Sequence, residues 1–137
     1  MILESLVCIA LNMYHEARSE DIDAMLAVGH VVMNRVESEK YPDTPCEVVY
    51  QAKHDSLGRL LLKQCQFAWY CDGRSDTPRN YEAWRLALVL AAEVMNTADN
   101  TNGALWYHAD YVQPKWAGNS YVQIGVHRFY NAIREKG

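Results

Sequence analysis

The chain has 137 residues, 50% of them apolar and 22% charged, which is enough for one packed domain and too short for two. We expect that domain to span residues 1–137, and the apolar content excludes a disordered chain. The net charge of −4 and the lack of a Lys/Arg block argue against nucleic-acid binding or attraction to an anionic membrane surface, and no apolar run is long enough for membrane insertion.

The first third of the sequence predicts two amphipathic helices. Apolar residues recur with helical spacing over residues 2–17 and again over residues 22–36, with Ser19 or Asp21 as the cap of the second helix. A Pro-rich turn at residues 41–45 then precedes a short helix predicted over residues 46–51.

The remainder of the chain predicts one more long helix and a small sheet. Residues 53–79 are polar and predict a structured surface loop. A helix is predicted over residues 81–98, because apolar residues follow a helical period there. The aromatic and β-branched segments 104–107 and 121–125 predict an antiparallel hairpin, and residues 129–136 a short helix. The predicted fold class is therefore α+β and mainly helical.

The four cysteines are too few for a disulfide scaffold and form no CxxC pair. Cys8, between Val7 and Ile9, is interpreted as a buried apolar residue. One bridge, between Cys46 and Cys71, stays open for a protein that works in an oxidising compartment. The N-terminal sequence lacks the basic region and cleavage site of a secretory signal, so we expect another factor to supply a route out of the cytoplasm.

Two reaction types that depend on histidine or cysteine are disfavoured. His15-Glu16 is similar to the start of a zinc-protease helix, but Ser19 stands where the second histidine ligand is needed. A Cys–His nucleophile is disfavoured because Cys8 looks buried, and Cys65 and Cys71 lack family-specific surroundings. We therefore expect no metal and no cofactor.

A single carboxylic acid that acts as a general acid is the remaining candidate. Glu16 lies three residues beyond Met13, near the apolar side of the first helix, so burial and the helix C-terminus favour its protonated form. Arg18 would oppose this effect if its guanidinium turned back toward the carboxylate. Glu93 on the third long helix is an equal competitor, and periodicity does not choose between the two acids.

The aromatic residues point to a carbohydrate ligand. Twelve of the fifteen Phe, Trp and Tyr residues lie between Phe67 and Tyr130, many of them beside Asn, Gln or Asp. Aromatic faces with polar neighbours suit sugar rings, which stack through C–H groups and hydrogen-bond through hydroxyls. Ordinary core packing explains any single one of these residues equally well.

Several fragments in the same order resemble the spore-cortex-lytic, SleB-type cell wall hydrolases. That family reads roughly GEARGE followed by a helix ending in LNRV, and residues 14–18 and 27–36 match these motifs. Further matches are at residues 41–51, 66–73, 101–107 and 124–130, so the similarity spans nearly the whole chain. The departures are His15 and Ser19 in place of glycines and an insertion at residues 52–64, and they concern substrate contacts more than chemistry.

The resemblance implies a lysozyme-like, lytic-transglycosylase-like fold and an enzyme that cleaves the MurNAc–GlcNAc β-1,4 bond of peptidoglycan. It further implies that Glu16 is the acid and base of a lytic transglycosylase that forms 1,6-anhydro-MurNAc. One carboxylate is enough there, because the C6 hydroxyl of the substrate is the nucleophile. The alternatives are a hydrolytic N-acetylmuramidase at the same site, with Asp72 as base, or a glycan-binding wall module without turnover.

We expect the partner to be a peptidoglycan glycan strand, and the protein to be a monomer. The hypothetical substrate contacts are the polar Gln66, Tyr107 and His127, the aromatic Phe67, Trp69 and Trp106, and Tyr130. His127 could instead only brace the hairpin, and Trp106 could be core. The expected place of action is the cell wall or periplasm. A phage endolysin released through a holin-type pore, a virion-associated hydrolase and a bacterial enzyme with a trimmed leader all fit.

Overall fold

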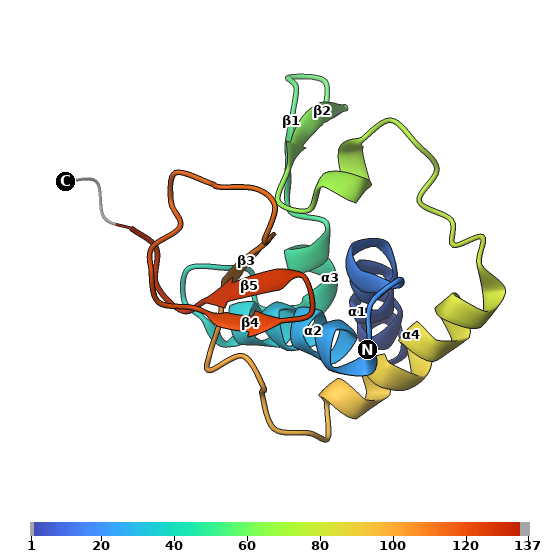
Figure 1. Ribbon diagram of the computed structural model, residues 1–137. Helices are drawn as coiled ribbons and strands as arrows, with labels where there is room; N and C mark the ends of the chain where they lie inside the picture. The colour runs from blue at the N-terminus through green and yellow to red at the C-terminus, as the bar shows by residue number, and fades with distance from the viewer. Residues whose placement is uncertain (1, 135–137) are drawn as a thin grey trace.

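The computed structural model describes residues 2–134, which form an α+β fold that is mainly helical, as predicted (Figure 1). The helices are α1 Ile2–Ala17, α2 Ile22–Glu37, α3 Pro45–Val49 and α4 Tyr81–Val94, with a 3-10 turn η1 at Ala68–Cys71. The strands are β1 Ala52–His54, β2 Leu60–Cys65, β3 Trp106–Ala109, β4 Val122–Ile124 and β5 His127–Tyr130.

Helix α1 is the centre of the packing, since α2, α3 and α4 all pack against it (Figure 1). Its predicted apolar stripe is buried at Ala10, Met13 and Ala17, and the facing stripe of α2 contributes Met25 and Val32. Asp21, rather than Ser19, caps α2, because its carboxylate accepts a hydrogen bond from the Ala24 N–H at 3.0 Å. None of the described helices combines the length and hydropathy that crossing a bilayer requires.

The three-stranded sheet corrects two predictions. Its order is β3-β5-β4, so segments 104–107 and 121–125 do not pair with each other, and β5 lies between them. The reason is Gly125, whose φ of 59° allows a tight turn that folds residues 127–130 back along β4. The helix predicted over residues 129–136 is wrong too, because Phe129 and Tyr130 lie in β5 and residues 131–134 are not helical. Residues 135 and 136 lie outside the described residues.

The loop predicted over residues 53–79 is wrong in part, because it contains the β1–β2 hairpin and η1. The hairpin projects from the helices in Figure 1. Its turn is formed locally, since the Asp55 carboxylate accepts hydrogen bonds from the backbone N–H groups of Leu57 and Arg59, and Gly58 has a φ of 79°. Strand β2 does not alternate between polar and apolar residues, because its exposed leucines, Leu61 and Leu62, are adjacent. The two-residue period that predicts a strand is therefore absent from its sequence.

Two helix ends differ from the predictions. Helix α4 ends at Val94 instead of residue 98, because the side chains of Asn96 and Thr97 donate hydrogen bonds back to the carbonyls of Ala92 and Glu93. Helix α3 occupies Pro45–Val49 instead of residues 46–51, with Thr44 as its cap.

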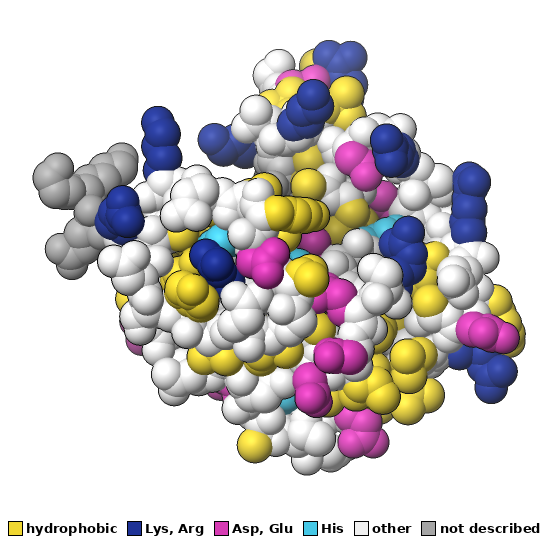
Figure 2. All heavy atoms as spheres, in the orientation of Figure 1, with side chains coloured by type: hydrophobic (Ala, Val, Ile, Leu, Met, Phe, Trp, Pro, Cys, Tyr) yellow, Lys and Arg dark blue, Asp and Glu magenta, His cyan; other side chains and the backbone are white. Residues whose placement is uncertain are grey.

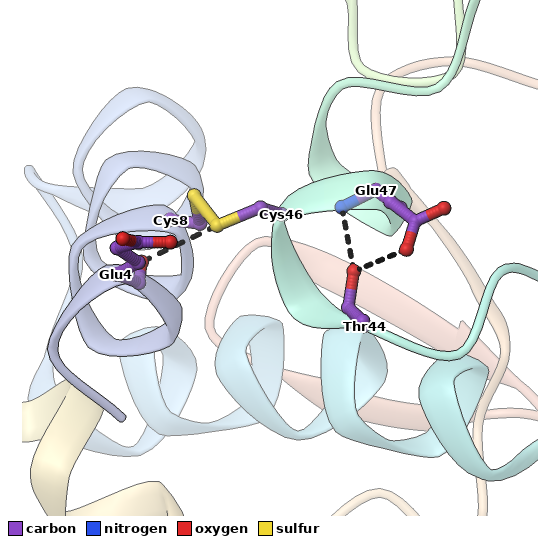
Figure 3. Close-up of a disulfide and its surroundings, with 5 residues drawn as sticks. All are labelled: Glu4, Cys8, Thr44, Cys46 and Glu47. Atoms are coloured by element: carbon purple, nitrogen blue, oxygen red, sulfur yellow. Dashed lines mark hydrogen bonds between the residues drawn. A yellow bond between two sulfur atoms is a disulfide. The ribbon is translucent and has the colours of Figure 1, made fainter. Parts of the chain in front are cut away.

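All four cysteines are bridged, as Cys8–Cys46 and Cys65–Cys71, so the predicted Cys46–Cys71 bridge is wrong. Cys8 is buried as predicted but is not an isolated thiol, because α3 places Cys46 against it (Figure 3). Cys46 Sγ also lies 3.3 Å from the Glu4 carbonyl oxygen. The sequence separations of 38 and 6 correspond to about 4 and about 2 kcal/mol of stabilisation in the chain-entropy account.

Candidate active site

Glu16 occupies the last turn of α1 and is partly buried. Burial raises its pKa above the ordinary value, and the nearby Glu20 acts in the same direction. The Tyr107 hydroxyl, His127 and Arg35 favour the carboxylate and oppose the shift without cancelling it. Glu93, the competing acid, lies on the exposed side of α4. The structure therefore distinguishes the two acids that periodicity left equal.

A chain of hydrogen bonds leads from the core to Glu16. The indole N–H of Trp69 donates to Asn12 Oδ1 at 2.9 Å, and the Asn12 amide donates to the Tyr107 hydroxyl at 3.5 Å. The Tyr107 hydroxyl lies beside Glu16 and favours its carboxylate form. Because Trp has only a donor, this bond fixes the orientation of the Asn12 amide and hence the direction of the whole chain. The donors of Trp69 and Asn12 therefore point toward Tyr107, the neighbour of Glu16.

Arg35 joins α2 to the rest of the site. Its side chain is buried, its Nε donates to the Leu105 carbonyl at 2.7 Å, and its Nη1 donates to Gln66 Oε1 at 3.4 Å. The guanidinium lies over the rings of Tyr41 and Phe67, at 4.6 and 5.0 Å from their centroids. It thus contributes a fixed positive charge close to Glu16.

Glu20 and His127 form a second polar pair beside Glu16. Glu20 Oε2 lies 2.9 Å from His127 Nδ1, and Glu20 Oε1 accepts a hydrogen bond from the Val126 N–H at 3.0 Å. The carboxylate thus lies against the imidazole, although Nδ1 makes no hydrogen bond with any described residue, and the ring packs edge-on against Tyr107 with 5.5 Å between the ring centroids. The β4–β5 turn brings this pair to the end of α1.

The predicted site residues divide into two groups. Tyr107 and His127 contact the Glu16 region directly, and Gln66, which is exposed, reaches it through Arg35. Phe67 and Trp69 are only 3% and 8% exposed, so they support Tyr107 and Asn12 and offer no open ring face to a sugar. Their predicted role as stacking walls does not fit this conformation.

Trp106 and Tyr130 lie on the opposite face of the sheet from Tyr107. They are direct partners across β3 and β5, and successive residues of a strand alternate between faces. Tyr130 is 1% exposed and its hydroxyl is 2.7 Å from His108 Nε2, with Trp116 packed edge-on against it. The prediction that Tyr130 contacts substrate thus does not fit this conformation, and Trp106, partly exposed, is not part of the core either.

Arg18 does not turn back to Glu16, because its guanidinium lies over the Tyr14 ring, 4.8 Å from the centroid. The neighbouring His15 is stacked on Trp69, and its Nε2 lies 2.8 Å from the Asp76 carbonyl oxygen. Within residues 2–134, no three His, Cys, Asp or Glu side chains come together as metal ligands would.

Sequence reasoning missed three residues of the site. Asn12 precedes Glu16 by four positions, so helical geometry places both on one face, and this signal was readable. Glu20 is the second acid of the GEARGE pattern and was also readable. Arg35 is the arginine of the LNRV pattern and was readable in the same way, but its carbonyl partner on Leu105 is 70 residues away and was not.

Comparisons with known proteins identify a family and similar folds. The family model of cell wall hydrolases matches residues 19–130, which include Glu20, Tyr107 and His127 and begin just after Glu16. The fold is similar to the catalytic domain of the SleB protein of Bacillus cereus, with a TM-score of 0.63 and 24% identity over 92% of this chain and 89% of that one. The catalytic domain of the germination-specific lytic transglycosylase SleB of Bacillus anthracis gives a TM-score of 0.63 and 23% identity over 91% and 92%. No curated protein matches the chain.

Proposed function

The chain belongs to the cell wall hydrolase family, and from that premise we propose that it cleaves the MurNAc–GlcNAc β-1,4 bond of peptidoglycan as a lytic transglycosylase. It is an enzyme that degrades the cell wall, and peptidoglycan is its substrate. The observation that carries the finer proposal is the environment of Glu16, a partly buried carboxyl group whose pKa is raised by burial.

The first proposed step is protonation of the leaving group. The Glu16 carboxylic acid gives its proton to the glycosidic oxygen as the bond to C1 of MurNAc breaks, and GlcNAc leaves with a free hydroxyl. The raised pKa of Glu16 supports this step, because it keeps a protonated fraction available closer to neutral pH.

The second proposed step uses the same side chain as a base. The Glu16 carboxylate accepts the proton of the MurNAc C6 hydroxyl, whose oxygen bonds to C1 and closes the 1,6-anhydro ring. The Trp69–Asn12–Tyr107 chain and the Arg35 guanidinium stabilise the carboxylate between the two steps. The attack is intramolecular, so positioning of the sugar supplies much of the rate.

Transglycosylation is preferred to hydrolysis because a second free carboxylate is missing from the described part of the site. A hydrolytic glycosidase needs one to attack the sugar or to activate water. Glu20 is close to Glu16, but each of its oxygens is already engaged, one by His127 and the other by Val126. Asp72 is exposed and is not among the charges that act on Glu16.

The test is digestion of purified sacculi in water enriched in oxygen-18, with the soluble muropeptides analysed by mass spectrometry. Transglycosylation gives anhydro-MurNAc ends without the label, whereas a muramidase gives labelled reducing ends. Glu16→Gln should reduce product formation by at least about 100-fold, as expected for loss of a general acid. Glu93→Gln is the matched control and should retain wild-type activity. Labelled reducing ends from the wild type would overturn the transglycosylase proposal.

A further inference from the structure

A cavity of about 330 Å³ lies beside the site, between the end of α1 and the segment that joins η1 to α4. In Figure 1 this segment runs down the right-hand side of the molecule from η1 to the start of α4, and Figure 2, in the same orientation, shows several Lys and Arg side chains on that side. Trp69 separates the cavity from the Asn12–Tyr107 chain, because its N–H bonds Asn12 while its ring stacks on His15. The cavity is lined by Tyr14, His15, Arg18, Trp69, Asp72, Arg74, Ser75, Thr77 and Arg79.

The walls of this cavity are anchored. The Tyr14 hydroxyl accepts hydrogen bonds from the backbone N–H groups of Arg79 and Asn80, at 3.1 and 3.0 Å. His15 holds the same segment through the Asp76 carbonyl at 2.8 Å. Three hydrogen bonds therefore tie residues 76–80, which include Arg79, to α1.

The lining is rich in positive charge. It contains the three guanidinium groups of Arg18, Arg74 and Arg79, and within residues 2–134 none of them forms an ion pair. The one acid in the lining, Asp72, uses its Oδ1 to accept a hydrogen bond from the Arg74 backbone N–H. On a protein with a net charge of −4, such a concave positive site selects anionic groups, and guanidinium groups suit carboxylates in particular.

We propose that this cavity binds the free carboxylates of the peptide attached to muramic acid, so that the enzyme prefers peptide-bearing glycan strands to bare ones. The inference rests on the proposed function, which puts a muramic acid residue at Glu16. His15 lines the cavity and is the next residue to Glu16 on α1, where one residue rises 1.5 Å.

The test compares two substrates that differ only in the peptide: glycan strands with their peptides, and the same strands after an amidase has removed them. We expect wild-type kcat/KM to favour the peptide-bearing strand roughly tenfold, as charged hydrogen bonds of this kind support. Arg74→Gln/Arg79→Gln should bring the ratio close to one, and Arg74→Lys/Arg79→Lys should retain part of it. Arg85→Gln, which removes an exposed charge from α4, should leave the ratio unchanged.

A binding measurement separates this proposal from the catalytic one. Glu16→Gln protein should bind a soluble disaccharide-peptide more tightly than the bare disaccharide, and amidation of the peptide carboxylates should abolish the difference. Equal binding of the two ligands, or a ratio that survives Arg74→Gln/Arg79→Gln, would overturn the proposal. Reducing ends in the product, together with an intact preference for peptide, would overturn only the transglycosylase chemistry.

Discussion

At the scale of one residue, the buried carboxyl group of Glu16 lowers the stability of the fold at neutral pH. Its pKa is raised by burial, so the folded chain binds its proton more tightly than the unfolded chain does. The free energy of unfolding therefore falls as pH rises from the unfolded pKa through the folded one. Glu16→Gln removes this titration, and we expect its Tm to exceed that of the wild type at pH 7.

The measurement is thermal unfolding between pH 4 and pH 8, with Glu93→Gln as the exposed control. The Tm advantage of Glu16→Gln should shrink toward pH 4, where the wild-type carboxyl is protonated in both states. A Glu16→Gln protein that is destabilised equally at every pH would show that contacts of the carboxylate outweigh its burial.

Gly125 controls the orientation of His127 through Glu20. A Cβ at position 125 would lie 2.6 Å from Glu20 Oε1, and the φ of 59° disfavours any larger residue. We expect Gly125→Ala to displace the Glu20 carboxylate and release the His127 ring. The variant should therefore lose much of its kcat while its Tm changes little. Gly103→Ala is the control, because it has a φ of 75° but no atom within 4 Å of the added Cβ. Equal loss of kcat in both variants would count against a role for Glu20 in positioning His127.

At the scale of the elements, Gly29 sets how closely α2 approaches α1 and α4. A Cβ there would lie 2.6 Å from Val94 Cγ2 and 3.1 Å from Met13 Sδ. Alanine gains about 1 kcal/mol of helix propensity over glycine, but overpacking a core costs about 1–3 kcal/mol. Because the branched Val94 is itself buried, we expect Gly29→Ala to lower the free energy of unfolding.

Denaturant unfolding measures this effect, with Gly118→Ala as the control, since no atom lies within 4 Å of its added Cβ. Adding Val94→Ala to Gly29→Ala should recover part of the loss, which gives a coupling energy in a double-mutant cycle. If the effects of the two substitutions are additive, the clash between the added Cβ and Val94 is not the cause of the lost stability.

At the scale of the whole molecule, the sequence predicts the helices better than the sheets. The helices depend on a 3.6-residue period that is local, so residues 2–17 and 22–36 were predicted within one residue of the observed ends. The central strand of the three-stranded sheet is the last in the sequence, and a local pattern holds no information on that order. Local patterning made Glu16 one of two equal candidate acids, and the family resemblance selected it over Glu93. Its neighbours Arg35, Tyr107 and His127 come from α2, β3 and β5, so bringing them together needed the tertiary fold.

Arg35 carries the contact on which this assembly depends. Its Nε hydrogen bond to the Leu105 carbonyl, with the Asn34 amide donating to the Ala104 carbonyl at 3.0 Å, fastens α2 to the segment that enters β3. Lysine lacks the planar guanidinium group, which donates a hydrogen bond to the Leu105 carbonyl and at the same time stacks on the rings of Tyr41 and Phe67. We expect Arg35→Lys to cost about 1–3 kcal/mol through the unsatisfied carbonyl, and to lower kcat at least tenfold because Tyr107 moves away from Glu16.

The measurement combines far-UV circular dichroism, hydrogen exchange and activity on sacculi. The helical signal should persist at 20 °C, because α1, α2 and α4 pack together without Arg35, while amide protection in β3 and β5 falls first. Arg128→Lys is the matched control, since this arginine lies in the same sheet and bonds Gln123 on its other side. Uniform loss of protection across helices and strands would mean that Arg35 stabilises the whole core. It would contradict the expectation that Arg35 mainly holds the three-stranded sheet against α2.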